Sequence, residues 1–264
     1  MSQATPNLNQ LFQNAQAEGS LSSASLKALN VTDIGAEIQA GLGISVEDVT
    51  ASEVVLVTIM PDDSGSIGYE GNAQAVRGGH NAVLDALSVT QQRDNILIHN
   101  RYLNGHVLYP YCPLDQAERM TPQNYDPKLG TPLYDQAVVL LGTVLAKAQE
   151  FADNGVPVRT VTLIITDGAD QHSRRSRPQD VAALVGDLLR SENHLVAAMG
   201  IDDGVTDFRR VFRDMGLRDE WILTPGTGDR EIQQAFQVFS QSAVRVSQMA
   251  GPFNAGNLGG FGQP

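Results

Sequence analysis

Apolar residues follow two different periods along the chain, which predicts alternating strands and helices. Uninterrupted runs of β-branched and aliphatic residues are typical of strands that are buried on both faces. Such runs occupy residues 54–60, 161–166 and 195–201, and a shorter strand is expected at 220–223. Apolar residues spaced three and four apart predict helices at 74–89, 133–152, 178–188, 207–215 and 229–249. The alternation indicates an α/β fold with 54–60 as a central strand.

A β-hairpin is expected between the first two long helices. Residues 96–102 and 106–109 alternate around Asn104 and Gly105, a dipeptide that favours a tight turn. His99 and His106 could pair across it. A metal site at that pair is disfavoured because the hairpin lacks carboxylates.

Paired glycines interrupt the helix at 74–89. Gly78 and Gly79 weaken a helix by about 1 kcal/mol each relative to alanine, so we expect them to permit close packing on the sheet.

The two ends of the chain differ from its middle. Residues 1–50 predict short amphipathic helices, with apolar stripes through Leu8 to Ala15, Leu26 to Leu29 and Ile34 to Leu42. These stripes pack either on the protein's own flank or on a partner. Residues 51–250 form the expected α/β domain, and residues 251–264 predict a flexible, glycine-rich tail.

Composition narrows the class of protein. With 264 residues, 42% of them hydrophobic, the chain can bury one substantial core. Its single cysteine, Cys112, rules out an internal disulfide. There is neither a signal-like start nor an apolar run of membrane-spanning length, so we expect a cytoplasmic protein that does not contact membranes. A formal net charge of −12 argues against nucleic acid as a partner.

Oxygen-bearing side chains follow the central strand directly. Asp62, Ser64 and Ser66 are spaced D-x-S-x-S in the loop that leads to the next helix. Loops at the carboxyl ends of buried parallel strands are where open α/β sheets place their ligands. Adjacent Asp62 and Asp63 would repel a phosphate unless a cation lay between them, so the loop favours a hard divalent metal. An ordinary helix cap or Asx turn is the alternative for this triplet alone.

Two further loops supply similar groups. Thr131 stands before a proline that can occupy the first turn of a helix, and Asp167 ends the apolar run 161–166. With Asp62, Ser64 and Ser66 in the same order, the sequence over roughly residues 50–245 resembles the von Willebrand factor A domain and its metal-ion-dependent adhesion site. Within that family it looks closest to intracellular bacterial members similar to the tellurite-resistance-associated A-domain proteins.

The resemblance implies a doubly wound, mostly parallel Rossmann-like sheet with one antiparallel edge strand and helices on both faces. It implies a divalent cation, Mg²⁺ with Mn²⁺ or Ca²⁺ as alternatives, held by Asp62, Ser64, Ser66, Thr131 and Asp167. Two carboxylates roughly neutralise such an ion while hydroxyls donate weakly, so the ion accepts an Asp or Glu from a partner protein. Family relatives often act beside ATPases, kinases or phosphatases. The expected function is metal-dependent protein binding without catalysis.

Other functions fit the residues less well. An aspartate-nucleophile phosphatase usually has an aspartate two residues after its nucleophile, where this chain has Ser64. A serine hydrolase would need a G-x-S-x-G turn, and a nucleotide-binding fold a P-loop or G-x-G-x-x-G. A structural module without metal stays open. Arg174, Arg175 and Arg177 form either a solvated loop or a surface that steers an acidic partner.

Overall fold

The computed structural model describes residues 7–29, 34–69, 71–248 and 260–261. Its strands form one six-stranded sheet in the order β3-β2-β1-β4-β5-β6. β3 is antiparallel to β2, and every other neighbouring pair is parallel. The strands are β1 Val54–Met60, β2 Ile96–Arg101, β3 Val107–Pro113, β4 Val158–Thr166, β5 His194–Gly200 and β6 Ile222–Leu223. The mostly parallel sheet with one antiparallel edge strand is confirmed.

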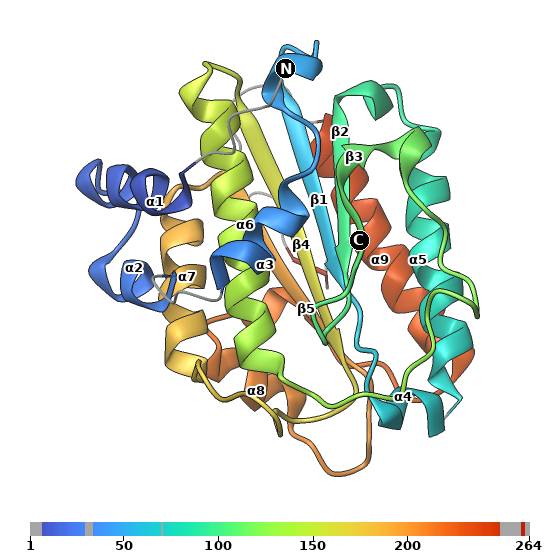
Figure 1. The fold of residues 1–264 in the computed structure, drawn as a ribbon. Helices are drawn as coiled ribbons and strands as arrows, with labels where there is room; N and C mark the ends of the chain where they lie inside the picture. Colours follow the sequence, from blue (N-terminus) through green and yellow to red (C-terminus); the bar gives the residue numbers. More distant parts are fainter. Residues whose placement is uncertain (1–6, 30–33, 70, 249–259, 262–264) are drawn as a thin grey trace.

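Helices cover both faces of this sheet, as Figure 1 shows, with α5 and α9 on one side and α6 and α7 on the other. The helices are α1 Leu8–Ala17, α2 Ser23–Leu29, α3 Ile34–Leu42, α4 Gly65–Tyr69, α5 Asn72–Ser88, α6 Leu133–Asp153, α7 Pro178–Arg190, α8 Phe208–Asp214 and α9 Asp229–Gln248. No helix in these described segments is long and apolar enough to cross a membrane.

The central strand β1 explains why its sequence lacks polar alternation. Every residue of β1 is buried, because successive side chains enter different helical layers. Val55 and Val57 join the core beneath α5 and α9, whereas Leu56 packs with Phe151 of α6. Covered on both faces and flanked by β2 and β4, β1 places its carboxyl end between neighbouring strands at one end of the sheet.

The N-terminal helices pack on the protein itself. Phe12, Leu29 and Ile38 are buried in the same core cluster as the inner faces of α6 and α7. Gly142 of α6 makes room for them, since a Cβ there would lie 2.7 Å from Leu29 and 2.8 Å from Ile38. Of the two expected partners for these stripes, the structure therefore selects the protein's own flank.

The ends of several elements differ from the sequence-based expectation. A short helix, α4, precedes α5, which itself begins at Asn72. Ile222–Leu223 is all that remains of the strand expected at 220–223, because residues 219–221 form a 3-10 turn. Most of the predicted tail, and Met249, lie outside the described residues. Within that tail Phe261 is described, and its ring lies 5.1 Å from the ring of Trp221, edge to face.

The two hairpin histidines have separate partners and do not pair with each other. The Nδ1 atom of His99 lies 2.8 Å from the carbonyl oxygen of Tyr109. The His106 ring packs instead against Tyr102, with 5.6 Å between ring centres. His106 precedes β3 and lies next to the turn, whereas His99 lies further along β2, between Ile98, which pairs with Cys112, and Asn100, which pairs with Tyr109.

The paired glycines of α5 permit close packing against α9, not against the sheet as expected. A Cβ at Gly79 would lie 2.0 Å from the ring of Phe236. Phe236 is fully buried, so neither the ring nor the helix can move away easily.

We predict that Gly79→Ala lowers the free energy of unfolding by about 1 to 3 kcal/mol, the usual effect of overfilling a packed core. Gly78→Ala is the matched control, because a Cβ there would approach nothing closer than 3.9 Å. Its better helix propensity should stabilise the protein by up to about 1 kcal/mol. Urea unfolding of the two variants measures both effects, and equal stabilities would contradict this packing.

Candidate metal centre

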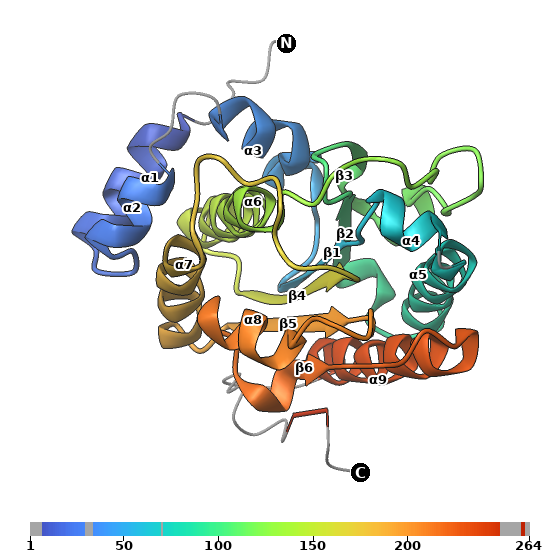
Figure 2. The same ribbon diagram turned by 90° about the horizontal axis from the view of Figure 1, so that it is seen from below.

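The loops that carry the candidate ligands meet at the carboxyl end of the sheet. Figure 2 looks onto this end, where α4 and the chain leading into α6 lie beside the ends of β1 and β4. Gly65 N donates to Leu129 O at 3.0 Å, and Ser64 and Leu129 form an isolated parallel bridge. The segment before Thr131 is thereby joined by backbone bonds to the D-x-S-x-S loop.

The Asp62 side chain is fully buried at this end. Its Oδ1 accepts the backbone N–H of Ser64 at 2.7 Å, and its Oδ2 accepts the Thr166 hydroxyl at 2.7 Å. The Tyr125 hydroxyl donates to the Asp62 carbonyl oxygen. Burial raises the pKa of the Asp62 carboxyl, while the bonds from Ser64 and Thr166 oppose that rise. The carboxylate is therefore held in place by neutral donors, and no cationic side chain of the described segments forms a salt bridge with it.

The two serine hydroxyls connect Asp62's loop to Asp167. Ser66 Oγ donates to Asp167 Oδ1 at 2.7 Å, and Ser64 Oγ lies 3.4 Å from the same oxygen. The two serine oxygens are 2.9 Å apart. Ser64 and Asp167 are buried, and Ser66 is half-buried. A hydroxyl that donates its proton to a carboxylate still has oxygen lone pairs for a cation.

Thr131 is positioned through its backbone. Its N–H donates to His172 Nδ1 at 2.8 Å, and its carbonyl accepts the N–H groups of Gln171 and His172. The His172 ring leaves no room for a Cβ at Gly130, which would lie 2.7 Å from Nδ1. The Thr131 loop is thus tied to the loop that follows Asp167.

Asn104 is a positioning residue that the sequence analysis missed. Its Nδ2 donates to Asp63 Oδ1 at 2.8 Å and to Gly130 O at 2.7 Å, and its N–H donates to Asp63 Oδ1. Burial raises the pKa of Asp63, and the bonds from Asn104 oppose the rise. The Asn-Gly turn explained Asn104 locally, so nothing in the sequence pointed to its second contact with the Thr131 loop.

Asp135 fixes the arginine-containing loop. Its carboxylate accepts the backbone N–H groups of Arg174, Arg175 and Ser176 at 2.7 to 3.0 Å. The Arg175 guanidinium also lies 2.8 Å from Glu37 Oε1, which joins this loop to α3. Arg175 is thus engaged within the protein, and the loop is more than the solvated segment considered from sequence.

The donor set suits a hard divalent cation. All candidate ligands offer oxygen: two carboxylates and three hydroxyls on three neighbouring loops, the composition that Mg²⁺ and Ca²⁺ prefer. Within the described segments, no group of three or more histidine, cysteine, aspartate or glutamate side chains is arranged to hold a metal. A cation here would depend on the hydroxyls, and it would place a positive charge beside the buried Asp62 carboxylate.

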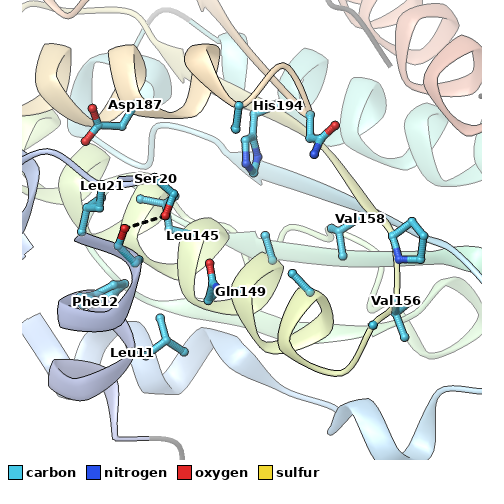
Figure 3. Close-up of a pocket in the computed structure, with 17 residues that line it drawn as sticks. Leu11, Phe12, Ser20, Leu21, Leu145, Gln149, Val156, Val158, Asp187 and His194 are labelled. Atoms are coloured by element: carbon cyan, nitrogen blue, oxygen red, sulfur yellow. Dashed lines mark hydrogen bonds between the residues drawn. The ribbon is translucent and has the colours of Figure 1, made fainter. Parts of the chain in front are cut away.

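A cavity lies at the amino end of the sheet, opposite the end that carries these loops. Figure 3 shows this cavity of about 430 Å³ between α1 and α6, with Phe12, Leu21 and Leu145 on its wall. His194 closes it above, with Nδ1 2.7 Å from the Thr160 hydroxyl and its pKa lowered by burial to about 4. Its lining includes one carboxylate, Asp187, and therefore does not resemble a divalent metal site.

No protein-family model and no curated protein matches the chain. Solved structures are similar in fold: proximal thread matrix protein 1 of the mussel byssus (14% identity, TM-score 0.52) aligns with 73% of this chain and 46% of its own. The pilus adhesin SpaC of Lactobacillus rhamnosus GG (12% identity, TM-score 0.53) aligns with 74% of this chain and 31% of its own. A von Willebrand factor type A protein of Catenulispora acidiphila (17% identity, TM-score 0.46) aligns with 74% and 43%.

The chain spans less than half the length of each of these proteins. At such low identity the similarity concerns the fold alone. Together with the strand order and the antiparallel edge strand, the similarity to the mussel and SpaC proteins shows that the chain has a doubly wound, mostly parallel α/β fold.

Proposed function

We propose that the protein is a metal-dependent protein-binding module. Asp62, Ser64, Ser66, Thr131 and Asp167 would hold one Mg²⁺, and the ion would accept an Asp or Glu carboxylate from a partner. The observation that carries this proposal is a fully buried Asp62 beside two serine hydroxyls that lie within 3.4 Å of Asp167 Oδ1. A bound divalent cation supplies the positive charge at which a partner's carboxylate can bind.

The chain's own residues would orient the ligands. Thr166 and the Ser64 N–H hold both oxygens of Asp62, and Asp167 receives the serine protons. Because these groups are fixed by bonds within the protein, little side-chain entropy would be lost when an ion binds. This preorganisation favours binding over a role as a simple helix cap.

The geometry supports a non-catalytic role. A phosphatase nucleophile needs a carboxylate oxygen that can reach the phosphorus, but Asp62 is fully buried and both of its oxygens accept hydrogen bonds. Ser64 occupies the position where such enzymes place an acid/base carboxylate. A structural module that never binds metal is the remaining alternative, and metal titration distinguishes it.

The partner is proposed to be a protein of the bacterial cytoplasm, such as an ATPase, kinase or phosphatase module. This part rests on the resemblance of the sequence motifs. The net charge of −12 disfavours nucleic acid. Mn²⁺ and Ca²⁺ are alternative ions, because both accept oxygen ligands.

The first prediction concerns metal binding. Mg²⁺ or Mn²⁺ at about 100 times its dissociation constant should stabilise the wild type by about 2.7 kcal/mol. Asp62→Asn should abolish this gain, since it removes a ligand charge while keeping the side chain's size. Calorimetric titration and thermal unfolding measure both. Equal heats of metal binding for the two proteins would show that Asp62 is not a ligand.

The second prediction concerns pH in the presence of chelator. Burial raises the folded-state pKa of Asp62 above the ordinary value of 3.8. As pH rises past 3.8, the unfolded chain therefore releases its proton first, and the folded state becomes progressively less stable until its own pKa is passed. Asp62→Asn should gain stability over wild type across this window. Urea unfolding from about pH 4 to 8 tests it, and an advantage that shrank as pH rose would contradict the charge argument.

The third prediction separates Thr131 from Asp62. We expect Thr131 to ligate when a partner carboxylate is bound, with Asp167 moving to a water-mediated position. Thr131→Ala should leave Mn²⁺ binding largely intact but weaken metal-dependent partner capture, whereas Asp62→Ala should lose both. Affinity capture with Mg²⁺ or chelator, followed by calorimetry, measures the two effects. Undiminished capture by Thr131→Ala would exclude a coupling role for its hydroxyl.

A further inference from the structure

Large hydrophobic side chains that are strongly exposed are rare in the described part of the chain. They are Tyr69, Val89, Leu129 and Val205, with 93%, 84%, 58% and 91% of their surface exposed. Three of the four lie at the carboxyl end of the sheet. Tyr69 is the last residue of α4, Leu129 forms the bridge to Ser64, and Val205 lies in the loop after β5. Val89 alone lies at the opposite end, because it caps the end of α5 before β2 begins.

Tyr69 and Leu129 flank the candidate metal loop directly. A Cβ at Gly65 would lie 3.5 Å from the Tyr69 ring, so this ring stands beside the residue between Ser64 and Ser66. Leu129 accepts the Gly65 N–H through its carbonyl at 3.0 Å. α4 also packs on the same segment, since a Cβ at Gly68 would lie 3.0 Å from the carbonyl oxygen of Pro127. The two exposed side chains thus stand on adjoining backbone.

Val205 lies at the same end of the sheet, in the loop after β5, the strand next to β4. It follows β5, whose last residue, Gly200, pairs with Thr166 next to Asp167. Asp203 holds the loop by accepting the N–H groups of Val205 and Thr206 at 2.9 and 2.6 Å. Val205 is therefore presented from a turn with internal hydrogen bonds, and its exposure follows from that turn.

Single exposed apolar residues are normal on protein surfaces. Here, however, Tyr69 and Leu129 adjoin the loop where the proposed ion would bind, and Val205 lies in the loop after β5 at the same end of the sheet; their backbones are fixed by hydrogen bonds or close packing. We propose that Tyr69, Leu129 and Val205, the apolar rim, bind partner side chains on either side of the carboxylate that the ion accepts. This inference rests on the proposed function and specifies its partner.

The charge of the protein indicates which partner segment fits. At a net charge of −12, the protein as a whole would repel a strongly acidic segment. Apolar neighbours add buried area without adding negative charge. The occupant is therefore an extended or looped protein segment with one Asp or Glu between apolar residues, as opposed to an acidic run, an anionic membrane or a second copy of this chain.

A displayed library of disulfide-constrained random peptides tests this inference. Peptides are selected on wild-type protein in Mn²⁺ and released with chelator, after calorimetry has established that Mn²⁺ binds. The released peptides should carry one Asp or Glu with large apolar residues within two positions on both sides. Acidic peptides without apolar enrichment would overturn the inference, as would a library without any chelator-released peptide.

Surface variants then locate the contact. Tyr69→Ser and Leu129→Ser should each weaken binding of a selected synthetic peptide about tenfold or more, and Val205→Ser by a smaller factor. Val89→Ser is the matched control at the opposite end of the sheet and should change nothing. All four variants should bind Mn²⁺ with wild-type heat, which excludes unfolding or damage to the ion site.

The possible failures are distinguishable. If the wild-type protein does not bind Mn²⁺, the proposed function is refuted, and the apolar rim with it. Intact Mn²⁺ binding with equal peptide affinity for wild type, Tyr69→Ser and Leu129→Ser would refute the apolar rim alone. Sedimentation showing Mn²⁺-dependent dimers that Leu129→Ser abolishes would identify a second copy as the occupant, and flotation with anionic vesicles that Tyr69→Ser abolishes would identify a membrane. Either result would overturn the peptide assignment.

Discussion

The buried carboxylate of Asp62 is the constraint around which the carboxyl end of the sheet is arranged. A charge removed from water at the end of β1 must be compensated by hydrogen bonds or by a cation. The chain supplies the Ser64 N–H and the Thr166 hydroxyl, and the raised pKa shows that burial outweighs them. This group lies between the ends of neighbouring strands, because β1 is flanked by β2 and β4 in the sheet.

Polar side chains hold the three loops around Asp62 in register with one another. The Asn104 side chain donates to both Asp63 and Gly130. The His172 ring accepts the Thr131 N–H. The Asp135 carboxylate accepts three backbone N–H groups of the loop after Asp167. Glu37 extends this support to α3 through Arg175 and through Gln136, 2.9 Å away. The N-terminal helix α3 is therefore part of the scaffold that positions these loops.

Sequence patterns predicted those parts of the molecule that local physics decides. Buried strands such as Val54–Met60, the hairpin turn at Asn104 and the helical N-terminus followed from periodicity and turn chemistry. The residue-level partners did not, because they depend on contacts between distant segments. Gly79 of α5 lies against Phe236 of α9, and the Asn104 side chain donates to the Gly130 carbonyl oxygen. His99 and His106 each contact a different tyrosine. The ligand set came from a sequence motif, and the structure joins Asp62, Ser64, Ser66 and Asp167 through hydrogen bonds.

A crystal of the protein grown with Mn²⁺, measured at wavelengths on both sides of the manganese absorption edge, tests the central claim most directly. The anomalous difference map locates the ion independently of any assumption about its ligands. One strong peak within about 2.5 Å of the Ser64 and Ser66 hydroxyl oxygens is predicted, with Asp62 and Asp167 bound directly or through water. A map that shows manganese bound elsewhere on the protein but no peak at these loops would contradict the account.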